Sequence, residues 1–120
     1  MMTTLTKLLK KHIEAAVATL QAAKSGNAAA TQKATAAFYA NGRQIARFLH
    51  KANPKFWSLA AMQKMMRIHL NQVVALAVDQ IKGHYGAAIK LYDKYIHHIL
   101  VGMADMLSNG IIQQFPNRFN

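Results

Sequence analysis

The sequence predicts an all-α protein, an up-down-up-down antiparallel four-helix bundle that forms a single domain over residues 1–120. Apolar residues recur at helical spacing along almost the whole chain. Glycine, asparagine and proline interrupt that spacing at a few places, where short turns are expected. An internal repeat further predicts that the bundle is a duplicated αα-hairpin.

The first hairpin is expected to turn at Ser25-Gly26-Asn27. Gly26 suits the end of one helix, and Asn27 can cap the start of the next. The second helix should end in the segment 52–57, because Pro54 disfavours helix at the residue before it. The apolar stripes of the two helices are Leu5, Leu9, Ile13, Ala16 and Leu20, then Ala34, Phe38, Ile45, Phe48 and Leu49.

The second hairpin starts near Pro54, which suits the first turn of a helix, and turns at Lys82-Gly83. Asn109-Gly110 is expected to end or kink the fourth helix. The apolar stripes are Met62, Met66, Val73 and Leu76, then Ile89, Tyr92, Ile96, Ile99, Met103 and Leu107.

The repeat relates the two hairpins by a nearly constant offset. His12 and His69 are 57 positions apart, and so are Gly26 and Gly83. In the second helix of each hairpin the offset becomes 58, where "IARFL" (45–49) aligns with "MADML" (103–107). Equivalent landmarks at equivalent positions predict a pseudo-twofold bundle.

The charge is strongly basic. Fifteen Lys and Arg residues stand against four Asp and Glu residues, which gives a formal net charge of +11. Such an excess favours a polyanionic partner, either nucleic acid or an acidic protein, with a lipid surface as a less favoured alternative. In an up-down bundle most of these cations gather toward one end. The predicted polyanion-binding residues are Lys7, Lys10, Lys11, Arg43, Arg47, Lys51, Lys55, Lys64 and Arg67.

A layer of polar side chains is expected inside the bundle. Across tight antiparallel hairpins, His12 should lie level with Asn41, and His69 level with His97 or His98. Asp93, one turn before His97, could orient that ring. The favoured interpretation is a hydrogen-bonded layer without a cofactor. The alternative is a site for zinc, another transition metal or haem that uses His12, His69, His97 and Asp93.

The residues needed for common enzyme chemistry are missing. The chain has no cysteine, a single glutamate, no paired carboxylates and no recognisable Ser–His–acid set. No glycine-rich strand–helix junction for a nucleotide is found. The sequence therefore predicts a small non-enzymatic binding protein. With no signal-peptide pattern and no apolar run long enough for a membrane span, we expect an intracellular, soluble protein, cytoplasmic or, in a eukaryotic host, nuclear. The oligomeric state is left open, with a homodimer among the alternatives.

Several segments together resemble a known family. "FYANGRQIARFLHKANPKFW" is followed by "MMRIHL", "LYDKY" and "MADMLSNGI" and then by "QQFPNRF". This succession resembles the C-terminal half of an uncharacterised bacterial helical-bundle family, over roughly residues 9 to 119. The resemblance implies the helical bundle and the histidine layer. Some members carry an acetylglutamate kinase label, but this chain lacks the sheet and glycine loops of a kinase. An acidic residue usual soon after the second histidine is replaced here by Asn71 and Gln72.

Overall fold

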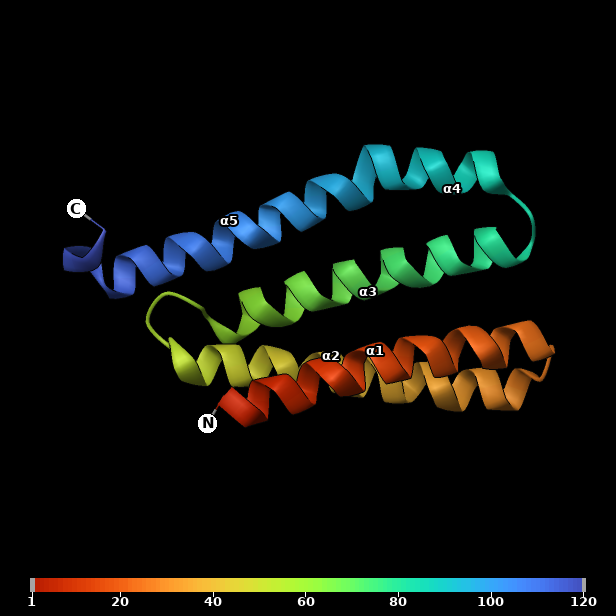
Figure 1. Ribbon diagram of the computed structural model, residues 1–120, viewed down its shortest axis with the longest axis horizontal. Coiled ribbons are helices and arrows are strands. Elements are labelled where there is room, and N and C mark those ends of the chain that lie inside the picture. The colour runs from red at the N-terminus through yellow and green to blue at the C-terminus, as the bar shows by residue number, and fades with distance from the viewer. Residues whose placement is uncertain (1, 120) are drawn as a thin grey trace.

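The computed structural model describes residues 2–119, which form four antiparallel helical segments and contain no strand. The chain runs up and down, so that both termini and the α2–α3 connection lie at the same end (Figure 1). The predicted fold class is confirmed. In chain order the elements are α1 (Met2–Ser25), α2 (Ala28–Ala52), α3 (Leu59–Ile81), α4 (Tyr85–Leu91), the π-helical turn η1 (Tyr92–Ile96), α5 (His97–Gln114) and the 3₁₀ turn η2 (Pro116–Arg118).

Glycine ends the first helix of each hairpin, as the sequence predicts. Gly26 has φ +78° and Gly83 has φ +77°, a left-handed conformation that side-chain-bearing residues rarely adopt. Asn27 then caps α2, because its Oδ1 accepts a hydrogen bond from the amide of Ala30 at 3.0 Å. The two hairpin turns therefore follow from their local sequences.

The start of α3 differs from the prediction, and one of the two alternatives predicted for Asn109-Gly110 is excluded. Pro54 lies in the turn before α3 rather than in its first turn, and Ser58 caps the helix by accepting from the amide of Ala61 at 3.1 Å. Asn109-Gly110 does not end the last helix, since α5 continues to Gln114. The reason is tertiary: Gly110 is buried against the ring of Trp57, which a Cβ at this position would overlap.

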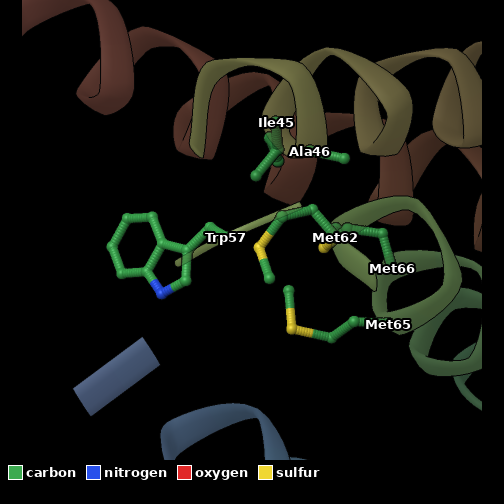
Figure 2. Close-up of a cluster of buried hydrophobic side chains, with 6 residues drawn as sticks. All are labelled: Ile45, Ala46, Trp57, Met62, Met65 and Met66. Atoms are coloured by element: carbon green, nitrogen blue, oxygen red, sulfur yellow. The ribbon is translucent and has the colours of Figure 1, made fainter. Parts of the chain in front are cut away.

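The main core lies toward the end of the molecule at which both termini are found (Figure 1). Ile45 and Ala46 of α2 pack with Trp57 and with three methionines of α3, Met62, Met65 and Met66 (Figure 2). Partly buried side chains close the cluster from α1, α2, α3 and α5, namely Leu8, Leu49, Ala61, Met103 and Leu107. The methionines thus fill the core, as their helical spacing predicts.

The α2–α3 connection holds α5 in place. Asn53, which is buried, donates from Nδ2 to the carbonyl of Gly110 at 3.0 Å, and Gln114 Nε2 donates to the carbonyl of Ala52 at 3.1 Å. The buried indole of Trp57 lies against Gly110, and its Nε1 donates to the carbonyl of Met106 at 3.4 Å. This connection is therefore a structural anchor for the fourth helix.

The fourth helical segment packs mainly on α3. We call α4, η1 and α5 together the fourth arm, residues 85–114. Among the described residues, no Cα atom of this arm lies within 8 Å of a Cα atom of α1 or α2. The radius of gyration is 16.1 Å, against about 14 Å for a compact domain of this length. The bundle is consequently open between α1 and the fourth arm (Figure 1).

Candidate functional site

A row of cations runs along the outer side of α2. Arg43, Arg47 and Lys51 are all exposed and follow each other at intervals of four residues. This spacing keeps the three on one side of the helix, with about 6 Å of rise between neighbours. We call these three residues the α2 ridge. It lies opposite the buried side of α2, which carries Phe38, Ala46 and other core residues.

Neighbouring helices add one cation on each side of the ridge. Arg67 of α3 shares a surface hollow with Arg43, and Lys11 of α1 shares another with Arg47 and Lys51. The five residues Lys11, Arg43, Arg47, Lys51 and Arg67 therefore form one surface across three helices, which we call the basic surface. The structure brings together residues that are far apart in the sequence.

The remaining predicted cations are exposed but lie outside this surface. Lys7 and Lys10 line a hollow on α1 together with Lys11 and Glu14. Lys55 lies in the turn before α3, with its Nζ 5.3 Å from the ring centroid of Phe56. Lys64 lines a separate hollow between α3 and α5. The predicted basic end exists, but its cations cover several sides of the molecule.

The basic surface has no carboxylate partner. Within residues 2–119, the only ion pair is between His84 Nδ1 and Asp79 Oδ1, at 3.8 Å, at the opposite end of the molecule. None of the five cations of the basic surface therefore forms an ion pair within the described part of the chain, and the nearest carboxylate is that of Glu14, which shares the hollow of Lys11. Their charge is available to an anion in solution.

Sequence reasoning missed two uncharged residues beside this surface. Tyr39 and Gln63 line the hollow of Arg43 and Arg67, each one helical turn before the arginine on the same helix. The Tyr39 hydroxyl also donates to Oδ1 of Asn71 on α3, which links α2 to α3 at this point. The spacing of four was the available signal, because it puts both residues on the arginine side of their helices.

The predicted polar layer forms around His12. His12 Nδ1 lies 2.8 Å from Asn41 Oδ1, and Asn41 Nδ2 donates to the carbonyl of Leu8 at 3.0 Å. The second bond fixes which end of the amide faces the histidine, so the proton of this pair sits on His12 Nδ1. The His12 ring also lies 5.0 Å from the ring of Phe38. Asn41 is only 5% exposed, and both its polar atoms are satisfied.

His69 completes the layer from α3 but lacks a hydrogen bond. Its ring stacks on that of His12, with 6.2 Å between the centroids. Its Nδ1 is buried and has no partner, and neither does the buried Oε1 of Gln72, one turn further along α3. Burial lowers the pKa of His69, and the neighbouring His12 lowers it further. A neutral imidazole at this position is therefore favoured.

The predicted four-residue metal set does not assemble. His97 and Asp93 are exposed on the fourth arm, and the ring neighbours of His97 are Tyr92 and His98. Over residues 2–119, no group of three or more His, Asp or Glu side chains is placed to hold a metal ion. The prediction placed His97 or His98 level with His69 near the interior of the bundle, whereas both histidines are exposed on the fourth arm. Only His12 and His69 of that set come together.

Comparison with known proteins found no matching family model, no matching curated protein and no matching solved structure. The resemblance to the bacterial helical-bundle family therefore stays a prediction. None of the helices within the described part of the chain is both long and apolar enough to cross a membrane.

Proposed function

We propose that this chain is a non-enzymatic binding protein that holds the phosphate backbone of a nucleic acid on its basic surface. The observation that carries the proposal is the absence of any carboxylate partner for the cations of that surface, in a chain with a net charge of +11. Uncompensated cations repel each other in the free protein, and a polyanion would relieve this repulsion.

The geometry of the α2 ridge supports a linear polyanion. Three side chains with about 6 Å of rise between them can contact successive charges along one strand. Two of the three are arginines, whose planar guanidinium groups can bind phosphate through two parallel hydrogen bonds. Lys11 and Arg67 widen the surface on either side. These contacts are independent of base sequence, so we expect binding without strong sequence specificity.

The test is a salt titration of binding to fluorescently labelled duplex DNA and RNA, followed by anisotropy. The logarithm of the affinity should fall linearly with the logarithm of the salt concentration, by about 0.9 per phosphate contact for duplex DNA. Replacing two ridge residues, Arg43→Ala with Arg47→Ala, should therefore reduce the slope by about 2.

A matched control removes the same charge elsewhere. Lys90→Ala with Lys94→Ala takes away two exposed cations, also four residues apart, on the fourth arm. It should change the slope much less than the ridge variant. Equal effects of the two double variants, or micromolar-or-weaker binding that neither changes, would contradict the proposal. Binding to polyglutamate but not to DNA or RNA would point to an acidic protein instead.

A second candidate function is a transition-metal or haem site at the stacked pair of His12 and His69. The observation in its favour is the buried and unpartnered Nδ1 of His69. The pair offers at most two ligands, so an external ligand or the haem itself would have to complete the coordination. Elemental analysis and an absorption spectrum of the purified protein test this candidate. Stoichiometric metal or haem that is lost in His69→Leu would favour it over the hydrogen-bonded layer.

A further inference from the structure

The chain exposes more surface than a protein of its size normally does. Its accessible area is 8144 Å² at 13.3 kDa, whereas a folded monomer of this mass exposes roughly 6,500 Å². The excess of roughly 1,600 Å² compares with roughly 800 Å² that each partner buries in a standard protein interface. The open bundle thus has ample area for a further protein contact.

Part of the exposed apolar area forms one side of α1. Leu9, Ile13, Val17 and Leu20 are all exposed and recur at helical spacing, which makes a continuous stripe. This stripe is distinct from the side that carries His12 and packs on α2 and α3. In a closed four-helix bundle a stripe of this kind would be covered by the fourth helix.

A second apolar patch lies on the side of α3 that faces α1. Leu76 is two helical turns after His69, so both point to the side of α3 over which α1 lies. There Leu76 lines a hollow with Ile89 and Tyr92 of the fourth arm, both exposed. Because α1 and α3 run parallel with His12 beside His69, Leu20 lies near the level of Leu76 (Figure 1). We call the stripe and this hollow together the apolar face.

The basic surface and the apolar face are separate. Lys11 lies about 160° around α1 from Ile13. The stripe itself has no charged member, and Asp93 is the one charged residue that lines the hollow. A face with so little charge gives neither an acidic nor a basic partner a large electrostatic advantage. It matches another apolar face, and every copy of the chain carries one.

We propose that two copies of the chain associate through their apolar faces. Twofold association, in which both copies use the same patch, is the commonest arrangement of soluble homo-oligomers. The basic surfaces, on the other side of α1, then stay clear of the contact. This separation allows two chains of charge +11 to associate despite their repulsion.

Sedimentation equilibrium of nuclease-treated protein at high salt tests the proposal without bridging by nucleic acid. The expected result is a reversible monomer–dimer equilibrium. Ile13→Glu should weaken it by roughly tenfold or more, because a carboxylate would be buried without a partner. The matched control is Ile112→Glu, an exposed isoleucine of α5 outside the face, which should leave the dimer intact. A monomer at all concentrations, or equal weakening by both variants, would overturn the proposal.

Cysteine labelling provides a second readout that does not depend on a charged substitution. Because the chain has no cysteine, Val17→Cys introduces a single reporter in the stripe. Its reaction with a maleimide should slow as the protein concentration rises through the dimerisation range, while Ile112→Cys should react at a constant rate. Concentration-independent labelling at both positions, with circular dichroism showing that both variants are folded, would count against the dimer.

Discussion

The two hairpins have histidine and glycine at equivalent positions, but the contacts that the two histidines make are different. His12 and His69 occupy equivalent places, yet His12 is hydrogen-bonded to Asn41 while Nδ1 of His69 has no partner. The position 58 residues after Asn41 is Ile99, whose side chain cannot form a hydrogen bond. The first hairpin thus pairs its partly buried histidine within itself, and the second does not.

The same contrast holds for apolar packing. The second helix of the first hairpin, α2, buries Phe38, Ile45 and Ala46. The fourth arm buries little beyond Ala88, Ile96 and Gly110 and leaves Tyr85 61% exposed. Similar spacing therefore produces similar helices and turns, which depend on local sequence. How deeply a helix is buried depends instead on the helices that pack against it.

Loss of the Trp57 anchor should have the largest effect. Trp57→Ala should lower the free energy of unfolding by about 3–5 kcal/mol, because it empties the space between the core and Gly110. Urea denaturation measures this loss. Hydrogen exchange should show that α5 loses more protection than α1 and α2. As a control, Tyr85→Ala on the exposed side should cost far less, and equal loss of protection in both hairpins would contradict the anchor.

Removal of Asn41 should cause the next largest loss of stability, and it tests the hydrogen bonds that distinguish the first hairpin from the second. Asn41→Ala leaves the carbonyl of Leu8 and Nδ1 of His12 without their partner, which should cost about 1–3 kcal/mol. Asn71→Ala is the matched control, because it removes an asparagine whose one bond, to Tyr39, is on the surface. If both variants have the same urea midpoint, the buried layer does not stabilise the fold.

The smallest expected effect is the pH dependence of stability that arises at His69, where the two hairpins meet. The pKa of His69 is lowered below its ordinary value of 6.5, mainly by burial and also by His12. The unfolded chain then binds more protons than the folded one between the lowered pKa and about 6.5, so stability should decline as the pH falls through that window. The ring that faces His69 is that of His12 on α1, which lies beside Phe38 of α2.

Urea denaturation at pH values from about 5 to 8 measures this dependence. His69→Leu should flatten the part of the curve below about pH 6.5, while His98→Leu, at an exposed position, should leave its shape unchanged. An identical pH dependence in the wild-type protein and in His69→Leu would mean that His69 does not contribute to acid destabilisation.

The sequence was sufficient for the parts of the molecule that depend on local rules. Helical spacing predicts the four segments, Gly26 and Gly83 mark the turns, and the geometry of the first hairpin predicts that His12 meets Asn41. In each case the signal comes from residues close in sequence or from one tight turn.

Contacts between hairpins could not be predicted in the same way. The side of α3 on which the fourth arm packs depends on Trp57 and Gly110, which are distant in sequence and carry no pattern that links them. The prediction that His97 and Asp93 join the layer failed for this reason. The basic surface was predicted as a set of cations, but its arrangement across three helices depends on how α1 and α3 pack against α2.

The π-helical turn η1 can be understood as the trace of a single inserted residue. The offset between the hairpins is 57 at Gly83 and 58 at Met103, so the predicted duplication implies one extra residue between them, and η1 lies in that interval. Leu91, which is partly buried, and Ile96, which is buried, lie five positions apart in segments that pack on α3, where the first hairpin has Ala34 and Phe38 four apart. A wider turn absorbs the extra residue locally. Without it, an insertion would rotate the rest of the helix by about 100° and turn Met103 and Leu107 away from the core.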